Sequence, residues 1–210
     1  MIDTKEKVLL TALQLFARDG YEAVSVRTIA EELGITKGAL YRHYKNKRDI
    51  FDCIVERMIK IDASRAADFD MPAETYDSRP DSYAETSLDA IQIYTMEQLK
   101  FWTEDAFGSK FRRMLILEQY RNTEMAELYS QCLVAGPVDY LEDLFRELTK
   151  KDVLKEENPR TLAVEYYAPL FLLIHMFDKT GDTKDLEEIL CNHTKQFLQI
   201  HAKDTGGKMI

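Results

Sequence analysis

Residues 21–48 constrain the fold of this chain more than any other segment. The spacing of their apolar residues predicts two short helices, over residues 26–33 and 37–44, joined by a turn at Gly34. The second helix ends in a basic and aromatic run, Tyr41-Arg42-His43-Tyr44-Lys45. This layout is typical of a helix-turn-helix, whose second helix fits the major groove of DNA.

The rest of the chain also has the periodicity of helices, and no run alternates apolar and polar residues as a half-buried strand does. A first helix is expected over Thr4–Asp19, with Gly20 as its stop. Ser25 and Thr36 stand where a side-chain oxygen caps the start of the two short helices. A fourth helix is expected from Lys47 towards residue 68. The predicted fold class is therefore all-α.

The second half predicts further helices, near 87–107, 110–121, 123–149, 160–178 and 183–202. Residues 70–86 hold two prolines and many turn formers, so they predict a loop or linker. Gly136-Pro137 either splits or kinks the 123–149 helix, because proline disrupts a helix interior. Asn158-Pro159 is a start signal, with a capping residue followed by proline at the first helical position.

These elements predict two domains. Residues 1–48 form a three-helix DNA-binding domain, and residues 49–68 form a connecting helix. Residues 69–203 form a second, helical domain. Residues 204–210 are expected to be a flexible tail.

The net charge of −9 is unusual for a nucleic-acid binder until it is divided by position. Residues 1–60 hold 11 basic and 9 acidic residues, whereas residues 61–210 hold 17 basic and 28 acidic ones. Within residues 35–48 there are five basic residues and no acidic one: Lys37, Arg42, Lys45, Lys47 and Arg48. Such a patch can neutralise phosphates while the acidic remainder discourages non-specific binding.

Several other classes of protein fit the sequence poorly. No apolar run approaches the roughly 20 residues that span a bilayer, and the first residues lack the layout of a signal peptide, so a cytoplasmic protein is expected. The three cysteines are far apart and match neither a disulfide framework nor a CxxC metal site. No motif of a hydrolase, metalloprotease, P-loop or dinucleotide-binding protein is present. We therefore expect no catalytic residues, no metal and no cofactor.

A longer pattern surrounds the helix-turn-helix: Ala12-Leu-Gln-Leu-Phe16, Gly20-Tyr21, Ser25-Val-Arg-Thr-Ile-Ala30, Gly34-Ile-Thr-Lys-Gly-Ala-Leu-Tyr-Arg-His-Tyr44 and Asn46-Lys47. This pattern resembles the N-terminal domain of the tetracycline-repressor (TetR) family over roughly the first 60 residues. The chain departs from the family at position 44, where Tyr replaces the more frequent Phe. Beyond residue 60 only the helical plan is compatible.

The resemblance implies which positions contact DNA: Ser25, Arg27, Thr36, Lys37, Gly38, Ala39, Tyr41, His43 and Lys47. Lys37 is the candidate base reader, because its long donor suits guanine O6 and N7. Tyr41, His43 and Lys47 are the candidate phosphate contacts. Tyr41 could instead be a packing residue, and His43 could lie on the surface without a contact. Arg42, Lys45 and Arg48 are either flanking charges or contacts.

The apolar helix at 160–178 and the striped helix at 183–202 cannot bury their surface within one chain. We therefore expect a homodimer that pairs these helices as a four-helix bundle and reads an inverted-repeat operator. The resemblance also implies a small hydrophobic or aromatic effector that releases a repressor from DNA, with Trp102, Tyr120 and His175 as candidate pocket residues. His175 could instead be a hydrogen-bonded core histidine. The alternative function is architectural or cell-cycle-related DNA binding controlled by protein partners, without an effector.

Overall fold

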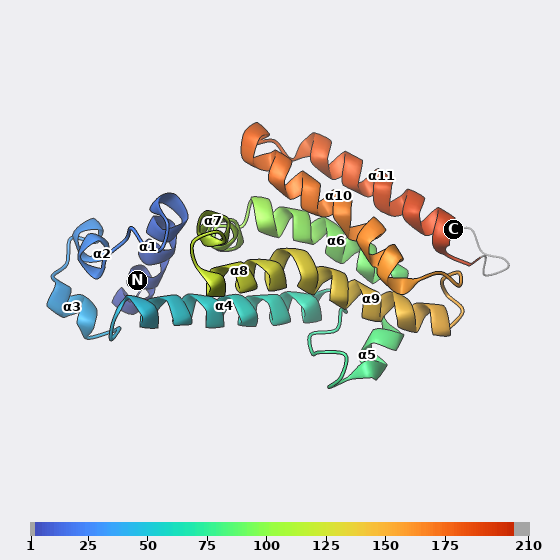
Figure 1. The fold of residues 1–210 in the computed structure, drawn as a ribbon, viewed down its shortest axis with the longest axis horizontal. Helices are drawn as coiled ribbons and strands as arrows, with labels where there is room; N and C mark the ends of the chain where they lie inside the picture. The colour runs from blue at the N-terminus through green and yellow to red at the C-terminus, as the bar shows by residue number, and fades with distance from the viewer. Residues whose placement is uncertain (1–2, 204–210) are drawn as a thin grey trace. The chain divides into compact units, whose positions relative to one another are not determined.

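The computed structural model describes residues 3–203, and within this range it is helical, with a single antiparallel bridge between Leu154 and Ala202. Figure 1 shows the helices in chain order. Their bounds are α1 Thr4–Asp19, α2 Val26–Glu32, α3 Lys37–Tyr41, α4 Lys47–Asp68, α5 Pro80–Glu85, α6 Leu88–Thr103, α7 Gly108–Glu118, α8 Thr123–Tyr129, the π-helical turn η1 Ser130–Val134, α9 Ala135–Lys150, α10 Pro159–Thr180 and α11 Lys184–His201. The predicted all-α fold class is confirmed. The tail predicted over 204–210 lies outside the described residues.

Contacts divide the chain into two compact units. The N-terminal unit comprises Met1–Asp62 and Glu104–Tyr129, and the C-terminal unit comprises Ala63–Thr103 and Ser130–Ile210. The sequence-based division assigned α7 and α8 to the second domain, whereas here they group with α1 to α3. The reason is that α7 packs along α1 and buries Phe111, Met114 and Leu115.

The N-terminal unit starts and stops its helices with local signals. Gly20 ends α1 at φ +89°, in the region that favours glycine. The Ser25 hydroxyl accepts a hydrogen bond from the Thr28 amide at 3.1 Å, and the Thr36 hydroxyl accepts one from the Ala39 amide at 3.1 Å. Both predicted caps are therefore confirmed, and α1 has the predicted bounds.

The second helix of the helix-turn-helix, α3, is shorter than predicted: it ends at Tyr41 and not at residue 44. The His43 amide donates to the Leu40 carbonyl at 2.9 Å, which is a three-residue step and tightens the last turn away from α geometry. Leu40 and Tyr44 are buried, as a core role requires. The Tyr44 hydroxyl donates to the Lys5 carbonyl at 3.1 Å, and burial raises the pKa of Tyr44 to about 12.

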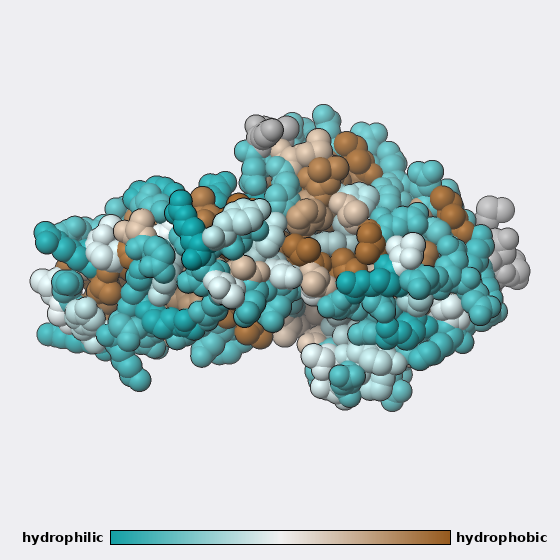
Figure 2. Space-filling view, in the orientation of Figure 1, coloured by the Kyte–Doolittle hydropathy of each residue, from teal (hydrophilic) through white to brown (hydrophobic). Residues whose placement is uncertain are grey.

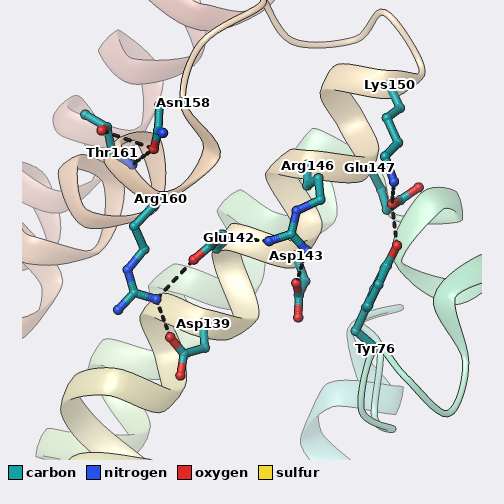
Figure 3. Close-up of polar contacts among 10 residues, drawn as sticks. All are labelled: Tyr76, Asp139, Glu142, Asp143, Arg146, Glu147, Lys150, Asn158, Arg160 and Thr161. Atoms are coloured by element: carbon teal, nitrogen blue, oxygen red, sulfur yellow. Dashed lines mark hydrogen bonds and ion pairs between the residues drawn. The ribbon is translucent and has the colours of Figure 1, made fainter.

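The predicted loop at 70–86 contains one short helix, α5, which begins at Pro80. Proline suits this position because it has no amide hydrogen to leave unpaired. Tyrosine hydroxyls fasten the segment: Tyr76 donates to Glu147 at 2.6 Å, and Tyr140 of α9 donates to the Pro72 carbonyl at 2.9 Å. Figure 3 shows Tyr76 directed at Glu147. The segment is thus packed on α9.

In the C-terminal unit, α10 starts as predicted. The Asn158 side chain accepts from the Thr161 amide at 3.0 Å, and Pro159 is the first helical residue. Arg160 forms ion pairs with Asp139 and Glu142 of α9, as Figure 3 shows. These ion pairs lie at the surface, so each contributes little to the free energy of folding.

The helix predicted over 123–149 is split shortly before Gly136-Pro137 into α8 and α9, which are joined by the π-helical turn η1 at Ser130–Val134. Val134, which precedes α9, has φ −126° and ψ −85°, outside helical geometry. In the core of the C-terminal unit, Tyr166 of α10 packs edge-on against Phe145 of α9 and Phe197 of α11.

No helix in the described part of the chain is both long enough and apolar enough to cross a membrane.

Candidate nucleic-acid interface

The amino end of α3 presents small and basic residues to solvent. Thr36, Lys37 and Gly38 are exposed, and Ala39 is half-buried. Among the described residues none forms an ion pair with the Lys37 ammonium, so its charge is available to an external anion or base. The lack of bulk at Gly38 and Ala39 allows the helix backbone to approach a groove closely.

The start of α2 carries the other predicted contacts on the same side of the turn. Ser25 uses its hydroxyl for the cap and shares a hydrogen bond of 2.9 Å with the Thr28 hydroxyl. Arg27 pairs with Glu31 one turn further along α2, at 2.6 Å between Nε and Oε1. Because both side chains are largely exposed, this pair is weak and Arg27 can exchange it for a phosphate.

Two aromatic residues, Tyr41 and His43, lie at and just after the carboxyl end of α3. Tyr41 is 48% exposed, so its ring does not act as a core residue, and the packing alternative is wrong. His43 is half-buried. A contact of either residue with phosphate stays a prediction.

Lys47, the first residue of α4, is held within the chain. Its ammonium donates to the Tyr21 carbonyl at 2.9 Å and lies 4.1 Å from the centre of the Tyr21 ring. The carbonyl and the ring hold the positive charge beside the amino end of α4, where helix geometry also favours an anion. The predicted phosphate site therefore has a preorganised cation.

Arg48 behaves differently from the other basic residues of the patch. Its guanidinium binds the Glu124 carboxylate through two hydrogen bonds of 2.5 Å each, and Nε binds Asp52 at 2.6 Å. The hydrogen bonds from these carboxylates raise the pKa of Arg48. Arg48 is thus an exposed residue whose charge is paired and which links α4 to α8, whereas Arg42 and Lys45, which are also exposed, lie outside this pairing. Nothing in the local sequence could indicate Glu124 as its partner.

A buried carboxylate in the N-terminal unit was not predicted from the sequence. Glu118, the last residue of α7, is fully buried, and neither of its carboxylate oxygens has a hydrogen-bond partner within the described residues. Gly20 lies against it, since a Cβ at Gly20 would overlap Glu118 Oε1. The packing of α1 against α7 therefore buries the Glu118 carboxylate at the carboxyl end of α1.

The three candidate effector residues do not form one cluster within a unit. Trp102 is buried in the C-terminal unit beside Phe101, with ring centres 5.0 Å apart. His175 Nδ1 lies 2.7 Å from the Phe171 carbonyl, which matches the hydrogen-bonded alternative. Tyr120 belongs to the N-terminal unit and is 91% exposed, because it follows the end of α7, so it lines no enclosed cavity. A pocket role for Trp102 and His175 stays a prediction.

Metal binding has no evident site in the part of the chain that the structure describes. Residues 3–203 contain no group of three or more His, Cys, Asp or Glu side chains placed to hold an ion.

The fold and the exposed amino end of α3 together define a helix-turn-helix domain of the kind that binds DNA. Residues 8–54 match the family model of the bacterial regulatory proteins of the tetR family. The tetracycline repressor protein class C of Escherichia coli is 44% identical over 57 residues, which are 27% of this chain and 26% of the repressor. Residues 8–54 are therefore similar in sequence to the regulatory proteins of the tetR family. The matched segment spans about a quarter of the length of this curated relative.

Solved structures extend the similarity to the whole chain. SmeT, the repressor of the multidrug efflux pump SmeDEF of Stenotrophomonas maltophilia, is 20% identical with a TM-score of 0.65, covering 97% of this chain and 92% of SmeT. A complex of SmeT with triclosan gives a TM-score of 0.66 at 20% identity, over 96% and 93% of the two chains. At this identity the likeness establishes the fold, which is TetR-like in both halves.

Proposed function

We propose that this protein is a transcriptional repressor that binds a palindromic operator as a homodimer and releases it when a small molecule binds the C-terminal unit. The exposed amino end of α3 carries the proposal, because Thr36, Lys37 and Gly38 project from a capped helix whose core residues are fully packed. The family match over 8–54 supports the same role. In this role Lys37 reads a base, and Lys47 binds a phosphate.

Dimerisation is supported by one face of α10. Val164, Leu172 and Met176 share that face at multiples of four residues, and all three are exposed. Figure 2 shows hydrophobic side chains gathered over α10. Ile189 and Ile200 add exposed apolar groups on α11, which packs beside α10. A two-fold copy covers this face and presents two recognition helices to half-sites about 34–36 Å apart.

An effector response is supported by the relatives and by composition. SmeT, which has the same fold, is known in complex with triclosan. The helices of the C-terminal unit supply large apolar and aromatic side chains, among them Trp102 and Phe101. We propose a small hydrophobic or aromatic effector and no catalytic activity.

Selection of genomic DNA fragments on the purified full-length protein tests DNA recognition. The expected result is one enriched palindrome, whose binding constant falls steeply as salt rises because bound phosphates displace counterions. Enrichment of single-stranded RNA, or of no common motif, would refute the proposal. Loss of binding on adding a cellular extract fraction of small molecules supports the effector, whereas loss only with protein fractions supports control by a protein partner.

Alanine variants separate the reader from the phosphate contact. Lys37→Ala should relax specificity at one base position by about 1–3 kcal/mol, because one bidentate base contact is lost. Lys47→Ala should weaken all sequences about equally and lower the salt dependence by about one phosphate. Lys60→Ala is the matched control, since Lys60 is an exposed lysine about 20 Å further along α4. A base-specific effect of Lys47→Ala would contradict the assignment.

A further inference from the structure

The turn η1 interrupts the α-helical pattern in the middle of the helix predicted over 123–149. Ser130–Val134 form one π-helical turn between α8 and α9, and the chain passes from the N-terminal to the C-terminal unit between Tyr129 and Ser130. Single π turns insert an extra residue into a helix and are frequent at functional sites. The turn η1 therefore begins where the chain enters the C-terminal unit.

Two residues just after η1 oppose a regular α-helix there. Gly136 lies so close to the backbone of Gln131 that a Cβ at this position would overlap the Gln131 carbonyl oxygen. Pro137 has no amide hydrogen, so it cannot donate to the carbonyl four residues earlier, that of Leu133. The local sequence therefore leaves a buried carbonyl without its usual donor.

The missing donor comes from α10. The Tyr167 hydroxyl donates to the Leu133 carbonyl at 2.8 Å, and both residues are buried. A buried carbonyl that loses its partner bears the full desolvation penalty. One hydroxyl on α10 thus supplies a hydrogen bond to the Leu133 carbonyl of η1.

We propose that η1 is a hinge and that Tyr167 is its latch, which couples α10 to α8. This inference rests on the proposed function, in which a signal from the C-terminal unit alters DNA binding. A bound effector with a hydrogen-bond acceptor competes for the Tyr167 hydroxyl. Once the Leu133 carbonyl is released, the π-helical turn can change its hydrogen-bond register by one residue. Tyr167 is therefore a positioning residue for the repressor.

The test compares Tyr167→Phe with Tyr166→Phe in the full-length protein. Tyr166 is the matched control because it is the adjacent tyrosine on α10, is also buried, and shares its hydroxyl hydrogen bond with Thr95 at 3.0 Å instead of with η1. Amide hydrogen exchange of residues 130–136 should be at least about tenfold faster in Tyr167→Phe and within about threefold of wild type in Tyr166→Phe. Affinity for the enriched palindrome should change at least about threefold only in Tyr167→Phe.

Equal exchange of residues 130–136 in the two variants would overturn the latch. Faster exchange in Tyr167→Phe with unchanged DNA affinity would overturn the coupling. If Tyr167→Phe does not fold, Gly136→Ala tests the coupling, since its Cβ forces η1 out of its present register while Tyr167 is retained, and unchanged DNA affinity in this variant would overturn it. If the wild-type protein binds no palindrome, the proposed function fails, whereas the exchange measurement still decides whether η1 is latched by Tyr167.

Discussion

The exposed apolar face of α10 allows a quantitative prediction for the proposed dimer. Leu172 is 59% exposed in the single chain. Full burial of a leucine side chain is worth about 1.5–3 kcal/mol, so burying the exposed part is worth about 1–1.8 kcal/mol. A two-fold interface contains each residue twice, which gives about 2–3.5 kcal/mol for the pair. Leu172→Asp should therefore weaken dimerisation at least about 30- to 300-fold.

Sedimentation velocity over a concentration series measures this change. Ile59→Asp is the control, because Ile59 is 63% exposed but belongs to α4 in the N-terminal unit. We expect Leu172→Asp to be monomeric at concentrations where wild type and Ile59→Asp are dimeric. The reasoning is refuted if Leu172→Asp dimerises as tightly as wild type, or if Ile59→Asp dissociates to the same extent.

Three further predictions concern the stability of the N-terminal unit. Gly20→Ala should lower the free energy of unfolding by about 1–3 kcal/mol, because of its positive φ and the overlap with Glu118, and a thermal melt with an unchanged midpoint would contradict this. Glu118→Met should raise the midpoint, since it removes two buried oxygens without partners; a lower midpoint would mean that the carboxylate has a stabilising role. The hydrogen bond from Arg57 lowers the pKa of Glu6 in the folded protein. The Arg57–Glu6 pair therefore adds to the free energy of unfolding above the unfolded pKa of about 4.5, and this stabilisation is lost as the pH falls through the folded pKa. Urea unfolding as a function of pH should therefore show less acid destabilisation in Glu6→Gln than in wild type, and identical pH profiles would exclude the pair as a cause.

Local rules predict much of the N-terminal unit because its helices begin and end with residues that act on their own neighbours. Gly20 stops α1, while Ser25 and Thr36 cap the next two helices through amides three residues away. The same holds for Asn158 and Pro159 at α10. The end of α3 was overestimated, because apolar spacing extends to Tyr44 although α3 ends at Tyr41 and the His43 amide donates to the Leu40 carbonyl in a three-residue step.

Contacts between distant residues could not be predicted in this way. Arg48 was one of three basic residues that the sequence left open as flanking charges or contacts, and only the fold brings Glu124, 76 residues later, to its guanidinium. Glu118 is buried because α7 packs along α1, and no residue near Glu118 in the sequence indicates this packing. The grouping of α7 and α8 with the DNA-binding helices depends on the same packing.

Gly136-Pro137 shows why local sequence left two outcomes open, a split or a kink, of which the structure adopts a split with a π-helical turn between α8 and α9. Proline removes one hydrogen bond from a helix, and its cost depends on whether another donor reaches the released carbonyl. That donor is Tyr167, 34 residues away on α10, so α8 and α9 are joined through a π-helical turn. A helix that depends on a side chain from another element for one backbone bond responds to whatever moves that element. The same dependence that prevented the prediction is what makes η1 suitable for transmitting a signal.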